Sequence, residues 1–103
     1  MPPTQKAKAK SKQEQLELLH AQITGFLRGM NIVEDVSLKI VNIGYPEDDG
    51  VVIQFHDDNT PKRKRLYWKI VKALDEHEYM LSYEESDRPT HHELTVQLPI
   101  PQA

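Results

Sequence analysis

The stretch that decides the fold is residues 51–76, which read VVIQFHDDNTPKRKRLYWKIVKALDE. In its first part, Val51, Ile53 and Phe55 occupy every second position, so they share one face of an extended chain. Such alternation is typical of a strand that is buried on one side. We therefore expect a strand over residues 51–57.

The rest of this stretch changes to the period of a helix. Asn59 or Thr60 can cap the helix N-terminus, and Pro61 suits the first helical position, where its missing N–H costs nothing. The apolar side chains then recur at helical spacing, which predicts a helix over residues 61–76. Its buried stripe would be Leu66, Tyr67, Ile70, Val71 and Leu74.

Upstream of this stretch lie another strand and another helix. Residues 35–45 alternate in one phase up to Ile40 and in the opposite phase after it, so either both faces are partly buried or a bulge switches the pleat. Residues 46–50, Pro-Glu-Asp-Asp-Gly, have the turn chemistry of a hairpin between the two strands. Before the strand at residues 35–45, residues 12–30 carry an apolar stripe at helical spacing, which predicts a helix with Ser11 as its N-cap.

Downstream, residues 79–84 and 92–100 predict two more strands, separated by a polar loop. The element order is thus α-β-β-α-β-β. We expect an α+β fold, a two-layer sandwich in which both helices cover one face of a four-stranded, mainly antiparallel sheet. This single domain would span residues 12–103, behind a disordered basic tail over residues 1–11.

The composition narrows the class of protein. The 103 residues include no cysteine, which rules out disulfides and thiol chemistry and fits a reducing compartment. No apolar run approaches the ~18 residues of a membrane span. The N-terminal lysines are not followed by the apolar segment of a secretory signal. We therefore expect a cytoplasmic protein that does not enter a membrane.

Charge is segregated along the chain, although the formal net charge is only −3. Residues 1–12 carry four lysines and no acid, and residues 62–72 carry six bases and no acid. By contrast, residues 34–58 and residues 75–93 each carry seven acids against one base. Blocks of this kind point to recognition of charged partners.

The basic and aromatic block at residues 62–69 is the main candidate site. Cations in the first turn of a helix face the positive end of the helix dipole, which costs about 0.3–1 kcal/mol for each exposed charge. A helix charged in this sense is not arranged for its own stability. The candidate binding residues are Lys62, Arg63, Lys64, Arg65, Trp68 and Lys69.

Three interpretations of this block remain open. It can recognise an acidic protein partner, or it can be neutralised within the fold by Asp57, Asp58 and the acidic loops. It can also bind nucleic acid through phosphate contacts and base stacking, helped by the lysines at positions 6, 8, 10 and 12. A pI near 5.9 counts against nucleic acid, because a nucleic-acid-binding domain usually has a basic footprint that this chain lacks.

The sequence offers no catalytic or metal-binding motif. None of the serines lies in a G-x-S-x-G elbow, and the four glycines form no phosphate-binding loop. His91 and His92 are neighbours that a strand would point to opposite faces. The acidic turn at residues 47–50 lacks the alternating spacing of a calcium loop. We therefore expect a protein that is not an enzyme and uses no metal or cofactor.

A second candidate surface lies on the first helix, opposite its apolar stripe. Gly25 and Gly29 are spaced one turn apart there, and glycine inside a helix costs about 1 kcal/mol relative to alanine. They could admit another element at close range, or Gly29 could belong to the helix C-cap with Gly25 merely tolerated. The candidate homodimer surface is Leu18, Gln22, Gly25 and Gly29.

These observations favour a small, non-catalytic protein-interaction or regulatory module that uses segregated charge to recognise a protein partner. The alternative is a nucleic-acid-binding protein that uses the block at residues 62–69 and the lysine tail.

Overall fold

A computed structural model shows how the chain folds, and it describes residues 11–32, 35–45, 48–82 and 90–101. Within these residues the chain forms helices and strands in the order that the sequence predicts. They are α2 (Lys12–Gly29), β1 (Val36–Val41), β2 (Gly50–Phe55), α3 (Thr60–Glu76), β3 (Met80–Ser82) and β4 (Glu93–Gln97). The α+β class and the α-β-β-α-β-β order are therefore confirmed.

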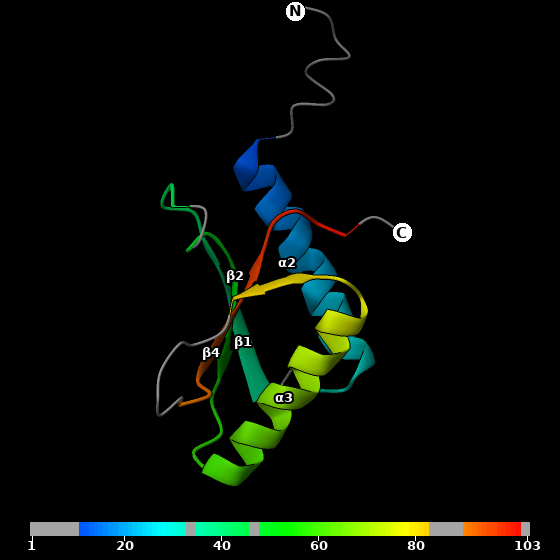
Figure 1. The fold of residues 1–103 in the computed structure, drawn as a ribbon, viewed down its shortest axis with the longest axis vertical. Helices are drawn as coiled ribbons and strands as arrows, with labels where there is room; N and C mark the ends of the chain where they lie inside the picture. The colour runs from blue at the N-terminus through cyan, green and yellow to red at the C-terminus, as the bar shows by residue number, and fades with distance from the viewer. Residues whose placement is uncertain (1–10, 33–34, 46–47, 83–89, 102–103) are drawn as a thin grey trace, which may run out of the picture.

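The strands form one antiparallel sheet in the order β1-β2-β4-β3. β2 pairs with β1 on one side and with β4 on the other, while the short β3 pairs with β4. Both helices lie on the same face of this sheet (Figure 1). The predicted two-layer sandwich is thus confirmed.

The core lies between the sheet and the two helices. Val51, Ile53 and Phe55 of β2 point into it, together with their cross-strand partners on β1 and β4. Leu66, which was expected in the buried stripe of α3, packs against the core but is only partly buried. The helices contribute Leu16, Leu19, Ile23 and Leu27 from α2, and Tyr67, Ile70, Val71 and Leu74 from α3.

Both helices begin at side-chain caps that the sequence predicts. Ser11 Oγ accepts a hydrogen bond from the Glu14 amide (3.1 Å), and Asn59 Oδ1 accepts one from the Lys62 amide (3.0 Å). Pro61 lies in the first turn of α3. Each cap satisfies an amide that has no partner within its helix, which stabilises the helix by about 1 kcal/mol.

β1 is shorter than the strand predicted over residues 35–45, because it ends at Val41. Its register with β2 is unbroken, so the bulge considered above is absent. After the strand, the amides of Ile43 and Gly44 donate to the Asp49 carboxylate (2.7 and 3.0 Å) instead of to a neighbouring strand. This side-chain acceptor ends β1 and turns the chain into the hairpin.

β3 and β4 lie inside the strands predicted over residues 79–84 and 92–100. β4 is shorter than predicted, and residues 83–84 of the other predicted strand lie outside the described residues. The predicted tail over residues 1–11 lies outside the described residues, apart from Ser11, which caps α2. Most of the loop predicted between β3 and β4 lies outside them too. In the part of the chain that the structure describes, no helix combines the length and the apolar character that crossing a bilayer requires.

Candidate functional site

Five of the six candidate residues on α3 lie on its solvent side. Four of them are exposed cations, and Trp68 is 46% exposed. They point away from the sheet because the apolar stripe on the opposite side of α3 packs into the core. We call these five residues the basic face: Lys62, Lys64, Arg65, Trp68 and Lys69.

Arg63, the sixth candidate, points the other way. Its side chain is 6% exposed, and its Nε and Nη1 donate to the carbonyl oxygens of Thr90 (3.0 Å) and Asp57 (2.9 Å). The guanidinium therefore ties α3 to the segment before it and to the segment before β4. Spacing could have revealed this role, because Arg63 precedes the buried Tyr67 by four residues and Ile70 by seven.

Packing against two buried rings holds Trp68 in place. Its ring centroid lies 5.1 Å from that of Tyr67 and 5.9 Å from that of His91, edge to face in both cases. Tyr67 and His91 are buried, and their centroids lie 5.1 Å apart. This geometry is the one that aromatic rings prefer. The indole is thus fixed at the surface. It would therefore lose little side-chain entropy when a partner covers it.

No acid among the described residues pairs with the basic face. The one ion pair within 4.0 Å in that part of the chain joins Lys12 to Asp49. Asp57, one of the acids that could neutralise the block, accepts the Asn59 amide (2.8 Å), and most of the acidic loop before β4 lies outside the described residues. The first turn of α3 contains no acid and its last turn no base, so charge and helix dipole oppose each other.

Acidic residues bound the basic face at both ends of α3. Asp57 and Asp58 precede the helix, and Asp75 and Glu76 lie in its last turn. At 1.5 Å per residue, the cationic stretch over residues 62–72 is about 15 Å long. The positive surface is therefore a compact patch and not a continuous track.

At the other end of the sheet, Asp49 organises the β1–β2 hairpin. Its carboxylate is 3% exposed, pairs with Lys12 of α2 and accepts the amides of Ile43 and Gly44. The hydrogen bond from Lys12, supported by the two amides, lowers the pKa of Asp49 against the opposing effect of burial. Lys12, which was counted with the lysine tail, is thus engaged within the fold.

Two apolar side chains project from this hairpin. Ile43 is 62% exposed and Tyr45 is 60% exposed. The sequence pattern had placed both in a strand, and the signal that could have set them apart is Gly44 between them, followed by the acidic turn. Asp48, next to them, is exposed as well. We call Ile43, Tyr45 and Asp48 the hairpin tip.

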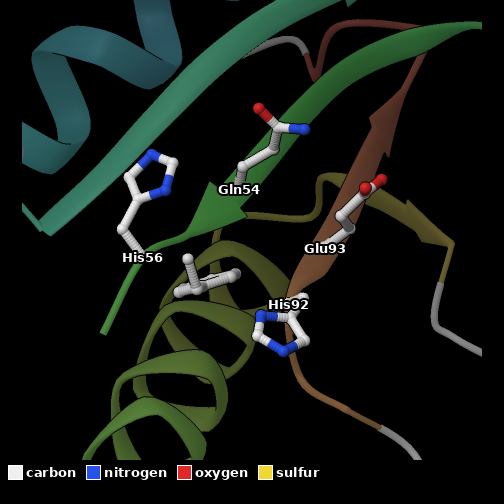
Figure 2. Close-up of a pocket in the computed structure, with 5 residues that line it drawn as sticks. Gln54, His56, His92 and Glu93 are labelled. Carbon is white, nitrogen blue, oxygen red and sulfur yellow. The ribbon is translucent and has the colours of Figure 1, made fainter. Parts of the chain in front are cut away.

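A shallow depression of about 240 Å³ lies where β2 ends and β4 begins (Figure 2), lined by Gln54, Phe55, His56, His92 and Glu93. His56 Nε2 lies 2.7 Å from Ser37 Oγ, a distance that suits a nucleophile and its base. However, the Phe55 amide donates to the His92 carbonyl and the His56 amide to that of Asp35. These amides cannot also stabilise an oxyanion, so the depression does not support acyl transfer.

Metal binding has no support in the residues that the structure describes. No group of three or more His, Asp or Glu side chains among them is placed to hold an ion. In the acidic turn, which was considered above for calcium, Asp49 already takes Lys12 and two backbone amides as its donors. Its oxygens therefore already have hydrogen-bond donors and are not arranged to coordinate a cation.

The candidate homodimer surface on α2 is exposed in all its residues, with Leu18 at 41%. Gln22 Oε1 accepts a hydrogen bond from the Tyr79 hydroxyl (3.2 Å). A Cβ added at Gly25 or Gly29 would meet no atom within 4 Å. No contact within the described fold therefore requires the two glycines, and the homodimer surface stays a prediction.

Comparison with known proteins adds no relative to this picture. No protein-family model matches the chain, and neither does any curated protein or solved structure.

Proposed function

We propose that this protein is a non-catalytic binding module whose basic face docks on an acidic surface of a protein partner. The observation that carries the proposal is the exposure of four cations and a half-exposed tryptophan on one side of α3, with cations in the first turn, where the helix dipole disfavours them. The arrangement costs the free chain stability. Binding to a partner would account for this unfavourable placement of charge.

The composition of the basic face matches that of a protein-binding hot spot. Tryptophan and arginine are among the residues most enriched at such sites. Trp68 would supply the apolar anchor, and the planar guanidinium of Arg65 can bind a carboxylate through two parallel hydrogen bonds. The surrounding lysines would mainly speed and orient the encounter.

The bounded shape of the basic face favours a protein partner over nucleic acid. A DNA duplex carries a phosphate charge about every 1.7 Å along its axis, so it would run past both ends of the ~15 Å cationic stretch. There it would meet Asp57 and Asp58 at one end and Asp75 and Glu76 at the other. A compact acidic patch on a protein avoids this repulsion.

We place this binding function in the cytoplasm. The chain contains no cysteine, which suits a reducing compartment. The partner would then be another cytoplasmic protein.

Fluorescence anisotropy with defined probes tests the proposal. The probes are a labelled peptide of alternating glutamate and leucine residues and labelled single-stranded and duplex DNA, each titrated at low and high salt. We expect the peptide to bind and to weaken with salt. Lys62→Glu combined with Arg65→Glu should weaken it at least about tenfold, or 1.4 kcal/mol.

The matched control combines Arg28→Glu with Lys39→Glu. Both residues are exposed and lie outside the basic face, so the control changes the net charge equally and should bind the peptide almost as the wild type does. Equal losses in the two double variants would overturn the proposed site. Tighter binding of DNA than of peptide, lost on Trp68→Ala, would select the nucleic-acid alternative instead.

A further inference from the structure

The hairpin tip and the basic face lie at opposite ends of the sheet (Figure 1). β1 and β2 meet at the hairpin, whereas the far end of β2 leads into the N-terminus of α3. The two surfaces therefore do not meet within one copy of the chain. Any contact between them is a contact between copies.

The hairpin tip is preorganised for binding. The Asp49 carboxylate takes the amides of Ile43 and Gly44, and the Tyr45 carbonyl accepts the amides of Asp48 and Asp49 (both 2.9 Å). The bond from Lys12 fastens this loop to α2. Because the backbone at Ile43, Gly44, Tyr45 and Asp48 is already hydrogen-bonded, these residues would lose little conformational entropy when a partner covers them.

The hairpin tip combines apolar surface with negative charge. Ile43 and Tyr45 are both about three-fifths exposed, and the Asp48 carboxylate lies beside them in the chain. Lys12 neutralises Asp49 but not Asp48, since the ion pair joins Lys12 to Asp49 alone among the described residues. The tip thus presents two apolar side chains with an acid that forms no ion pair with any described residue.

The basic face has the complementary chemistry. Trp68 offers a half-exposed apolar surface, and the four cations around it offer opposite charge to Asp48. Two hairpin tips placed together would oppose Asp48 to its own copy, and two basic faces would oppose cations to cations. Only the pairing of tip with face brings opposite charges together.

We infer that the hairpin tip of one copy of this chain docks on the basic face of a second copy. The inference rests on the proposed function, because it names the acidic protein surface that the basic face takes. The contact joins two different surfaces, so a pair joined by one contact keeps one free tip and one free face, and association continues into open chains or closed rings according to the rotation between copies. Two surfaces of this size make a weak contact that salt disrupts.

Sedimentation velocity over a concentration series at low salt tests the inference. The mean mass of the wild type should rise with concentration and return to that of the monomer at high salt. Tyr45→Ser, which changes an exposed side chain, should stay monomeric, and so should Lys62→Glu combined with Arg65→Glu. Met80→Ser is the matched control, because Met80 is 51% exposed and belongs to neither surface, so this variant should associate as the wild type does.

Mixing the two defective proteins gives the sharper result. Tyr45→Ser keeps the basic face, and the double charge variant keeps the hairpin tip. An equal mixture should form one-to-one dimers and nothing larger, since each dimer has used its only pair of intact surfaces. Such complementation is not expected if the same surface of each copy pairs with itself, because a variant with that surface altered could not pair with either protein.

Three results would overturn the inference: a wild type that stays monomeric at every concentration in low salt, association that Tyr45→Ser leaves unchanged, or a mixture that does not pair. Association lost on Leu18→Glu but kept in Tyr45→Ser would assign the contact to the candidate surface on α2. The peptide titration separates the two proposals. If the peptide binds and the wild type stays monomeric, self-association fails and the proposed function stands.

Discussion

At the scale of single residues, the carboxylate of Asp49 determines the shape of the hairpin. It is nearly fully buried, yet its oxygens have three donors, Lys12 Nζ and the amides of Ile43 and Gly44. A buried charge is tolerated when it is paired and hydrogen-bonded in this way. The same bonds end β1 and connect the hairpin to α2, so a change at this one residue should affect both elements.

Asp49→Asn should therefore destabilise the protein at neutral pH, because the neutral amide cannot pair with Lys12. The pKa of Asp49 in the fold lies below its ordinary value of 3.8. Its stabilisation is thus fully present above about pH 3.8 and is lost as the pH falls through the lower, folded-state pKa. Urea unfolding at several pH values should show a constant gap between wild type and variant near neutrality, and the gap should close in acid. A gap that widened on acidification would contradict this account.

Arg63 belongs to the same scale, since its guanidinium holds three segments together. Arg63→Met keeps most of the apolar stem but removes the hydrogen bonds to Asp57 and Thr90. We expect the free energy of unfolding to fall by about 2 kcal/mol. Arg65→Met is the control and should change stability by about 0.5 kcal/mol or less, because Arg65 is exposed. Equal effects in chemical denaturation would contradict the structural role of Arg63.

At the scale of elements, the backbones of β2 and β4 come close together at Gly50. A Cβ added to Gly50 would overlap the carbonyl oxygen of Val96, which belongs to the backbone of the neighbouring strand and cannot move independently. A Cβ added to Gly25, on the exposed side of α2, would meet no atom within 4 Å. The two glycines thus differ in the space around them, which the sequence does not show: it places Gly25 inside a helix and Gly50 at the end of the hairpin turn.

Alanine at these two positions should therefore have opposite effects. Gly50→Ala should lower the free energy of unfolding by about 3 kcal/mol or more, because β2 and β4 must move apart. Gly25→Ala should raise it by up to about 1 kcal/mol, because alanine is the better helix former. Chemical denaturation of both variants beside the wild type measures the difference. A destabilising Gly25→Ala would show that the glycine has a role that the monomer does not reveal.

At the scale of the whole molecule, the distribution of charge does not favour the stability of the free chain. The sheet separates an acidic hairpin at one end from a basic helix start at the other. α3 has cations where its dipole favours acids, and acids where it favours cations. If the basic face serves a partner, changes that improve the free chain should impair the complex.

Lys62→Glu is the simplest case of this trade-off. An acid in the first turn of α3 should stabilise the fold by about 1 kcal/mol, while binding of the acidic peptide becomes weaker. Lys69→Glu, in the middle of the helix, should weaken binding as well but change stability by about 0.5 kcal/mol or less. Thermal unfolding and anisotropy on the same samples measure both quantities. A destabilising Lys62→Glu would mean that Lys62 has a structural partner.

Much of the fold could be predicted from local patterns. The alternation of Val51, Ile53 and Phe55 marked β2, and the caps Ser11 and Asn59 marked the starts of both helices. These signals are local, because a cap or a period depends on residues within one or two turns. The end of β1 was predicted too late, at residue 45, because the acceptor that ends it is the side chain of Asp49 from beyond the turn.

The candidate site could be predicted only in part. The block of cations is visible in the sequence, and five of its six residues lie on one exposed side of α3. The burial of Arg63 and the exposure of Ile43 and Tyr45 were not predicted, because residue type outweighed the local signals, which are the helical spacing of Arg63 and the Gly44 that precedes the acidic turn. A charged residue was assumed to face water and an apolar residue the core, and these three residues do the opposite.

The sequence by itself thus determined the class of fold, the order of the elements and the segregation of charge, since periodicity, capping and composition are properties of neighbouring residues. Only the tertiary structure decided which side chains reach the surface and which surfaces lie far apart. Burial and hydrogen bonding depend on what the rest of the chain places nearby: a carbonyl of Thr90 for Arg63, and Lys12 for Asp49. The separation of the basic face from the hairpin tip arises in the same way, from the length of β2 between them.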